Sequence, residues 1–404
     1  MLIPNALSDH GIPLDPRDAE CLSITAADEV ERFLSHRPEH VPTTLHVLPA
    51  LARALKVASI AVKDESTRLG LGSFKALGGS YAVIRLVLEE ASRRLGRVVD
   101  VAELLTPEIR AIAQTMTVGC ATDGNHGRSV AAGAQLVGAN AAIFVHSGVS
   151  PDRVEAIARF GARMIHVPGT YDDAVEEAAR TCAAEGWIVV SDTSWPGYER
   201  IPGLVMQGYT AMIREALAAM PEKPTHVFMQ AGVGGLAAAV AGHLAVIYGA
   251  ERPRFIVVEP ARAACLFESA KAGQSVKIDA GEPTIMAMLE CYEPSLVAWR
   301  ILSRAADAFM TVDEADAEDV MRRLARPLPG DPAIVSGESG GAGLAGLIQV
   351  ANSAQMRALL GLDETARVFV INTEGATDAG RYAAIVGASA AGIADASGAP
   401  RASA

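Results

Sequence analysis

Short apolar runs alternate with helical patterns along most of this 404-residue chain. Each apolar run is long enough for one buried strand, and each helical pattern is long enough to cross back over a sheet. Strands that are joined by helices in this way usually run parallel, with helices covering the faces of the sheet. The sequence therefore predicts an α/β fold built on doubly wound parallel sheets.

The spacing of apolar residues predicts the individual elements. The stretch from about residue 387 onward is rich in alanine, glycine and serine, a composition typical of disordered chain. We therefore expect this tail to be disordered. The predicted strands cover residues 57–62, 141–146, 163–167, 187–191, 226–230, 255–259 and 368–371, and the predicted helices cover residues 26–34, 127–137, 151–160, 172–184 and 202–220, with a further helix that begins around Lys75.

Charge and hydropathy exclude several classes of partner. The net charge of −12 at pH 7 argues against binding to nucleic acid or to an anionic membrane. Mean hydropathy is high, at +0.23, but no stretch approaches the roughly 18 apolar residues of a membrane helix. The first 18 residues lack a basic segment followed by an apolar core, so we expect no secretory signal. These features favour a cytoplasmic protein that acts on a small molecule.

The five cysteines predict no metal site. They form no C-x-x-C pair and no His/Cys cluster with the spacing of zinc ligands. Such a sparse set is typical of buried thiols. Cys265 and Cys291 flank one short segment, so a disulfide between them is a hypothesis that counting free thiols would test.

Chemically useful residues recur at one kind of position, the loop after a predicted strand. In parallel α/β sheets, ligands bind at the carboxyl ends of the strands. Because several candidate residues share this position, we expect them to form one composite site. They are Lys75, Asp123, Asn125, Asp192, the loop 232–235 and Thr373.

Two of these features indicate a cofactor. A cation at Lys75, in the first turn of a helix, would oppose the helix dipole, so a neutral, imine-forming amine fits better there. A surface lysine is the alternative. Gly232-Val233-Gly234-Gly235 lies between a strand and a helix and can present backbone N–H groups to a phosphate, or it is only a tight packing joint. It matches neither Walker A nor the dinucleotide fingerprint. An imine-forming lysine with a separate phosphate loop fits pyridoxal 5′-phosphate.

Three motifs in this order and spacing resemble the fold type II enzymes that use this cofactor, the tryptophan-synthase-β or serine/threonine dehydratase group. They are Ser73-Phe74-Lys75, Asp123-Gly124-Asn125-His126-Gly127 and the loop 232–235. The resemblance extends over residues 62–378. It implies two doubly wound α/β domains with the cofactor between them, the large one from residues 1–89 and 171–404 and the small one from residues 90–170. It also implies a homodimer.

Further motifs resemble diaminopropionate ammonia-lyase within that group. They are Lys63-Asp64-Glu65-Ser66, Thr122-Asp123-Gly124-Asn125-His126-Gly127, Asp192-Thr193-Ser194-Trp195 and Ser336-Gly337-Glu338-Ser339-Gly340. In that family Asp123 stands where ordinary dehydratases carry serine. The resemblance thus implies α,β-elimination of D- or L-2,3-diaminopropionate to pyruvate and two ammonia. A serine/threonine dehydratase or a D-serine ammonia-lyase is the nearest alternative, and a non-catalytic protein that binds pyridoxal phosphate is an alternative of another class.

The resemblance also implies a role for each cofactor-binding residue. Lys75 would bind the cofactor covalently, Asn125 would hydrogen-bond the ring 3′-oxygen, and Thr373, or Asn372 beside it, would face the pyridine nitrogen. A hydroxyl facing that nitrogen favours elimination over transamination. Glu338 lines the ring or caps a helix. The implied cofactor-binding residues are Phe74, Lys75, Asn125, Gly232, Val233, Gly234, Gly235, Leu236, Glu338 and Thr373.

Three residues would carry the proton transfers. Elimination needs a base for the Cα proton, and the β-amino group must be in its ammonium form so that it can leave as ammonia. We hypothesise that Asp123 takes this proton from the D-isomer, that Lys75 takes it from the L-isomer, and that Asp192 holds the β-ammonium group. The alternatives are a turn residue at Asp123 and a helix N-cap at Asp192. His126 is expected to be a hydrogen-bonded loop histidine rather than a catalyst.

Overall fold

The chain forms two compact units. The computed structural model describes residues 1–37, 39–122 and 124–397. The first unit comprises Met1–Ile24, Val41–Phe74 and Met212–Ala404, and the second comprises Thr25–His40 and Lys75–Ala211. The small domain expected at 90–170 lies inside the second unit, which also includes the residues on both sides of it. Boundaries at residues 90 and 170 stay a prediction.

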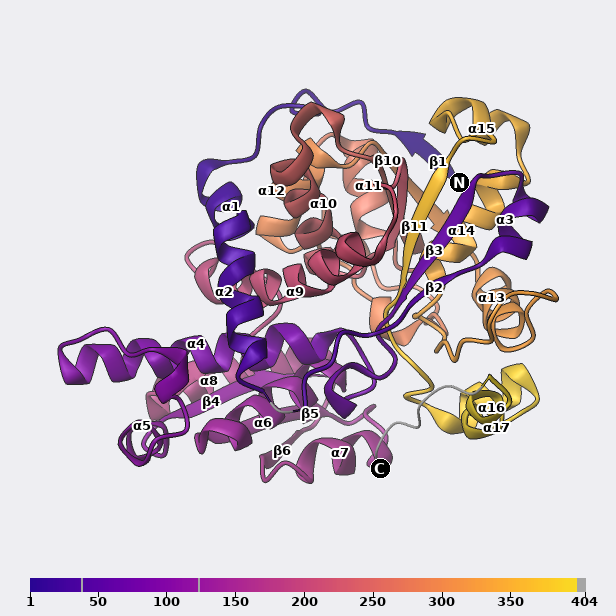
Figure 1. The fold of residues 1–404 in the computed structure, drawn as a ribbon. Helices are drawn as coiled ribbons and strands as arrows, with labels where there is room; N and C mark the ends of the chain where they lie inside the picture. The colour runs from indigo at the N-terminus through magenta and orange to yellow at the C-terminus, as the bar shows by residue number, and fades with distance from the viewer. Residues whose placement is uncertain (38, 123, 398–404) are drawn as a thin grey trace. The chain divides into compact units, whose positions relative to one another are not determined.

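The first unit contains a seven-stranded sheet with the order β1-β10-β9-β8-β11-β3-β2. Figure 1 labels β1, β10, β11, β3 and β2 of this sheet. Its five inner strands run parallel, and the two edge strands are antiparallel to their neighbours. The strands are β1 (Leu2–Pro4), β2 (Leu45–Val47), β3 (Ser59–Asp64), β8 (His226–Gln230), β9 (Arg254–Pro260), β10 (Ala308–Val312) and β11 (Arg367–Asn372).

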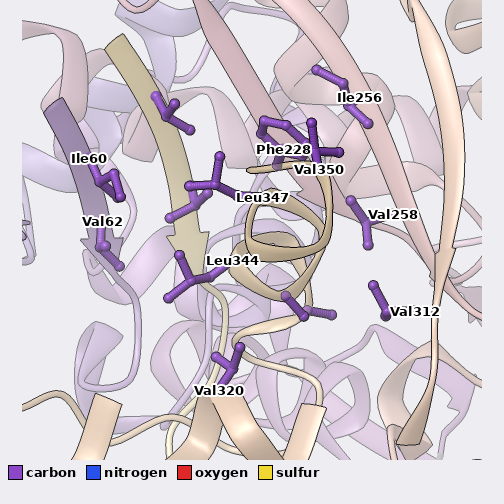
Figure 2. Packing of buried hydrophobic residues seen from close by; sticks show 14 of the residues in the cluster. Ile60, Val62, Phe228, Ile256, Val258, Val312, Val320, Leu344, Leu347 and Val350 are labelled. Atoms are coloured by element: carbon purple, nitrogen blue, oxygen red, sulfur yellow. The ribbon is translucent and has the colours of Figure 1, made fainter. Parts of the chain in front are cut away.

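Helix α14 (Ala342–Ala351) lies at the centre of the apolar core of this unit. Figure 2 shows its Leu344, Leu347 and Val350 side chains among residues of β3, β8 and β9. Strands β8 and β9 are buried along almost their whole length and are apolar at their centres, as parallel strands covered on both faces are. The other helices are α1 (Pro16–Cys21), α3 (Pro49–Leu55), α10 (Gly235–Tyr248), α11 (Cys265–Ala272), α12 (Leu296–Ala305), α13 (Glu314–Ala325), α15 (Ala354–Leu360), α16 (Ala379–Val386) and α17 (Ala390–Ser397).

The second unit contains a four-stranded sheet, β6-β5-β4-β7, in which every neighbouring pair is parallel. Helix α9 begins here, and its last residues belong to the first unit. The strands are β4 (Thr117–Ala121), β5 (Asn140–His146), β6 (Arg163–Val167) and β7 (Ile188–Val189), and the helices are α2 (Ile24–Ser35), α4 (Lys75–Leu95), α5 (Pro107–Ala113), α6 (Asn125–Val137), α7 (Pro151–Ala158), α8 (Tyr171–Glu185) and α9 (Arg200–Ala219).

The predicted α/β fold with parallel sheets is confirmed, and each predicted strand overlaps an observed one. The prediction of a disordered tail is wrong for α17. Ile393 of this helix packs in a cluster with Tyr382 and Val386 of α16, and that contact stabilises a segment whose composition suggested disorder. Among the described helices, none is long and apolar enough to cross a membrane. The described residues contain no cluster of acidic, histidine and cysteine side chains that could hold a metal ion.

Four charged side chains of the first unit form a largely buried network around the loop that follows β3. Arg68, in the 3₁₀ helix η1 (Arg68–Gly70), donates to Glu65 at 2.7 and 2.8 Å and to Glu215 at 2.7 Å. Lys63 Nζ donates to Glu215 Oε2 and to the carbonyl oxygen of Thr43, both at 2.6 Å. Two positive and two negative charges therefore balance in a site that water hardly reaches.

We expect Glu215→Gln to destabilise the protein by about 3 kcal/mol, because the change leaves one buried positive charge without a partner. Burial opposes ionisation of Glu215, but Arg68 and Lys63 outweigh it and lower its pKa. The stabilisation is therefore complete above the unfolded pKa of about 4.3 and is lost as the pH falls through the folded value. Urea denaturation of both proteins at pH 7 measures the difference. Exposed Glu222→Gln is the control, and equal stability of all three proteins would contradict the prediction.

Candidate active site

In the first unit, the candidate residues follow β8 and β11, two parallel neighbours whose carboxyl ends meet at one edge of the sheet. Gln230 donates its side-chain N–H to Thr373 Oγ1 at 3.0 Å and to the carbonyl oxygen of Gly340 at 2.6 Å. Since Thr373 Oγ1 accepts this bond, the hydroxyl can donate its own proton to another acceptor. Gln230 is a site residue that the sequence analysis missed, although a glutamine that ends an apolar strand is a visible signal.

The structure favours Thr373 over Asn372 as the residue that would face a pyridine nitrogen. Asn372 Nδ2 donates to Asp64 Oδ1 at 2.8 Å and to the carbonyl oxygen of Val335 at 2.9 Å, so its amide group is already engaged. The carbonyl oxygen of Thr373 accepts the N–H of Phe74 at 3.0 Å. This hydrogen bond fixes the last residue before Lys75 at the end of β11.

The glycine loop after β8 leaves little room for a side chain at Gly232 or at Gly234. A Cβ atom at Gly232 would lie 2.9 Å from Cys291 Sγ, and one at Gly234 would lie 3.1 Å from Ala298 Cβ. Gly234 also has a φ of +98°, which favours glycine. Helix α10 begins at Gly235, and no side chain of the described residues caps it. Its first N–H groups can therefore bind a phosphate.

Cys265 and Cys291, the pair for which a disulfide was a hypothesis, are both free thiols in this structure.

We expect Gly234→Ala to weaken the affinity for pyridoxal 5′-phosphate by about tenfold, since an alanine at positive φ costs about 1–2 kcal/mol. The loop would relax this strain by moving its N–H groups. Titration of the cofactor-free protein with pyridoxal 5′-phosphate gives the Kd. Gly281→Ala is the matched control, because a Cβ atom there meets nothing within 4 Å. A Gly234→Ala protein with the control's Kd would show that the loop does not bind the phosphate.

In the second unit, two packed helices begin with candidate residues, α4 with Lys75 and α6 with Asn125. Glycines bring these helices together, since a Cβ atom at Gly133 would lie 2.7 Å from the Cα atom of Ser80. The backbone N–H of Ser80 donates to Ser129 Oγ at 3.0 Å across the same contact. The small residues that follow both motifs therefore set the distance between the two helix starts.

The amine of Lys75 lies against the carboxylate of Asp192, with 2.7 Å between Nζ and Oδ2. Asp192 comes two residues after the last backbone bond of the short strand β7, in a turn, and the next helix begins at Arg200. It therefore does not cap a helix. His126 Nε2 lies 2.8 Å from the carbonyl oxygen of Val190, which can only accept, so Nε2 carries a proton. His126 Nδ1 lies 3.8 Å from Asp192 Oδ2.

The charge states follow from these contacts. Burial opposes ionisation of Asp192, but His126 and Lys75 outweigh it and hold the pKa of this carboxyl well below its ordinary value. Burial lowers the pKa of His126, which favours the neutral ring at neutral pH. Asp192 is therefore an ionised carboxylate beside an amine, an arrangement that attracts a second ammonium group and can exchange protons with it.

The remaining predicted residues are placed as follows. Asp123 lies outside the described residues. Asn125 is buried, at 9% exposure, and Phe74 is half-buried. Glu338 is 2% exposed, with Oε1 3.8 Å from Arg381 Nη1, and it lies ahead of Gly341, the N-cap residue of α14. Glu338 therefore does not cap that helix.

These groups fit pyridoxal 5′-phosphate. In the first unit, the N–H groups of the loop 232–236 would hold the phosphate and the Thr373 hydroxyl the pyridine nitrogen. In the second unit, Asn125 and Lys75 are the residues that the family resemblance assigns to the ring 3′-oxygen and the aldehyde carbon. A Cβ atom at Gly232 or Gly234 would contact neighbouring side chains, and this close packing supports the assignment of the loop to the phosphate.

The sequence and the fold match those of known pyridoxal-phosphate dependent enzymes. Residues 37–374 match the family described as pyridoxal-phosphate dependent enzyme. The chain is 41% identical over 352 residues to diaminopropionate ammonia-lyase of Escherichia coli (strain K12), covering 85% of this chain and 87% of the relative. It is 39% identical over 368 residues to diaminopropionate ammonia-lyase of Salmonella typhimurium, covering 89% and 91%.

A crystal structure of diaminopropionate ammonia-lyase from Escherichia coli, in complex with an aminoacrylate-PLP azomethine reaction intermediate, superimposes with a TM-score of 0.85. The two chains are 37% identical, and the alignment covers 96% of each. The predicted resemblance is confirmed at the level of sequence and of fold. The chain belongs to the diaminopropionate ammonia-lyase family of pyridoxal-phosphate dependent enzymes.

Proposed function

We propose that this protein is an ammonia-lyase that converts 2,3-diaminopropionate into pyruvate and two molecules of ammonia. The observation that best supports this proposal is the Lys75–Asp192 pair, an amine and a carboxylate 2.7 Å apart. A β-amino substrate differs from serine or threonine in having a second ammonium group. An ionised carboxylate attracts that group, whereas a hydroxyl leaving group gains nothing from it.

The protein's own residues have separate tasks in this proposal. Lys75 binds the cofactor covalently and removes the Cα proton of the L-isomer. Asp123 removes this proton from the opposite face in the D-isomer, and Asp192 keeps the β-nitrogen protonated so that it leaves as ammonia. The cofactor, when bound, supplies an electron-withdrawing ring that stabilises negative charge at Cα. The C–N bond at Cβ breaks, and water then converts the released enamine into pyruvate and the second ammonia.

The decisive experiment measures pyruvate release by the purified protein from each stereoisomer of diaminopropionate, with D-serine and L-threonine tested in parallel. We expect diaminopropionate to be consumed with a kcat/KM at least about 100-fold above that of either hydroxy amino acid, because the carboxylate recognises the second ammonium group. Faster turnover of D-serine or L-threonine would favour a dehydratase instead. Cofactor binding without pyruvate from any substrate would favour a non-catalytic protein.

We expect Asp123→Asn to lower kcat for the D-isomer by about 100-fold and to change kcat for the L-isomer much less. The amide cannot accept the Cα proton, while Lys75 still can on the other face. Steady-state kinetics with each pure isomer measures both values. Equal retention of both activities would remove the proposed role of Asp123 as a base.

Two coarser expectations accompany this function. The family resemblance supports a homodimer, which sedimentation of the purified protein would test. We also propose a cytoplasmic location, which fractionation of cells that express the protein would test.

A further inference from the structure

The loop that follows Asp192 doubles back on itself through a tight turn. Trp195-Pro196-Gly197-Tyr198 has proline at the second position and glycine at the third, where φ is +85°, as a type II β-turn requires. The backbones of Trp195 and Tyr198 pair at 2.9 and 3.3 Å. Their rings stack with centroids 4.2 Å apart and planes 16° from parallel. The turn thereby returns the Tyr198 side chain towards β7.

The Tyr198 hydroxyl then binds the backbone just ahead of Asp192. It donates to the carbonyl oxygen of Val189 at 2.8 Å and accepts the N–H of Ser191 at 3.0 Å. Strand β7 has only two residues, and its last backbone bond to β4 is from the N–H of Val190 to Gly119. Strand β7 lies at the edge of its sheet, and the Tyr198 hydroxyl takes the place of a further strand neighbour for Val189 and Ser191.

His126 holds the same segment at the carbonyl oxygen of Val190, 2.8 Å from Nε2. Three consecutive residues ahead of Asp192 are therefore bound by two side chains. Burial raises the pKa of Tyr198 well above its ordinary value, so the hydroxyl keeps its proton throughout the physiological range and remains a donor.

We infer that Tyr198 is a positioning residue for the reaction. By holding the backbone of 189–191, its hydroxyl keeps the Asp192 carboxylate within ion-pair distance of Lys75. The inference rests on the proposed role of Asp192. Neither ring of the Trp195–Tyr198 pair needs to touch the substrate, because the hydroxyl acts through the backbone.

A double-mutant cycle tests this inference on the holoenzyme. We expect Tyr198→Phe to lower kcat for diaminopropionate by about tenfold, since small misplacements of a reacting group have effects of this size or larger. In an Asp192→Asn background the same substitution should change kcat by less than about twofold, because the group that Tyr198 positions is gone. Equal fold-changes in the two backgrounds would overturn the inference while leaving the role of Asp192 intact. If Asp192→Asn alone leaves kcat unchanged, the proposed role of Asp192 fails and this inference fails with it.

Hydrogen exchange supplies a readout that does not depend on activity. In Tyr198→Phe the amide of Ser191 loses its acceptor, so it should exchange about tenfold faster than in the wild type, and an unchanged rate would contradict the inference. Tyr81→Phe is the matched control: the Tyr81 hydroxyl accepts an arginine N–H within α4, far along the chain from Ser191, and its loss should affect neither kcat nor this amide. Gly197→Ala keeps the hydroxyl and strains only the turn, since a Cβ atom there meets nothing within 4 Å. It should lower kcat in the wild-type background alone, and the same loss in both backgrounds would again overturn the inference.

Discussion

Replacing Lys75 with alanine is expected to lower kcat for pyruvate formation by at least about 10⁴-fold. The substitution removes the amine that would bind the cofactor covalently and that would act as the base for the L-isomer. It also removes the cation 2.7 Å from Asp192, so the pKa of that carboxyl rises towards its ordinary value. The measurement is coupled detection of pyruvate, with the visible absorbance of the bound cofactor recorded on the same samples.

Two controls make the Lys75→Ala result specific. Lys277→Ala removes an exposed lysine of the first unit and should leave kcat unchanged. A small primary amine added to the Lys75→Ala protein should restore part of the activity, because it can replace the missing base. Pyruvate formation at the native rate by Lys75→Ala protein would overturn the proposed function as a whole.

Asp192→Asn is expected to lower kcat for diaminopropionate by about 10²–10³-fold. Asparagine has the same shape as aspartate, but it is neutral and can neither attract the β-ammonium group nor exchange a proton with it. The pKa of Asp192 lies below the ordinary value of about 3.9, so the wild-type carboxylate stays ionised as the pH falls to 5. The contribution of Asp192 to activity should therefore be constant between pH 5 and pH 8.

Comparing two substrates shows whether Asp192→Asn impairs recognition of the β-ammonium group or impairs the enzyme in general. Any slow turnover of D-serine should fall by a much smaller factor than turnover of diaminopropionate, because D-serine has no second ammonium group. Exposed Asp279→Asn, in a loop of the first unit, is the control for the loss of one negative charge. Equal losses of turnover with both substrates would show that Asp192 does not recognise the β-nitrogen.

The sequence predicted the regular part of the fold because periodicity and turn chemistry are local. Residues 226–230 were predicted as a strand and form β8 with the same bounds, and the helix expected around Lys75 begins at that residue. Strand β10 was missed, although Ala308–Val312 is an apolar run of five residues. The edge strands β1 and β2 have three residues each, and only their pairing with a neighbour defines them.

By itself, the sequence determined the fold class, the cofactor class and the loops in which the candidate residues lie, because each depends on residues close together in the chain. Only the tertiary structure decided which of these side chains meet. Asp192 and Lys75 form a hydrogen bond although they are 117 positions apart in the sequence, and Gln230 and Thr373 do so at a separation of 143 positions. The Tyr198 hydroxyl binds a backbone that the turn at Gly197 brings back to it. No local pattern encodes such pairs, since they form when the sheets and helices that carry them pack together.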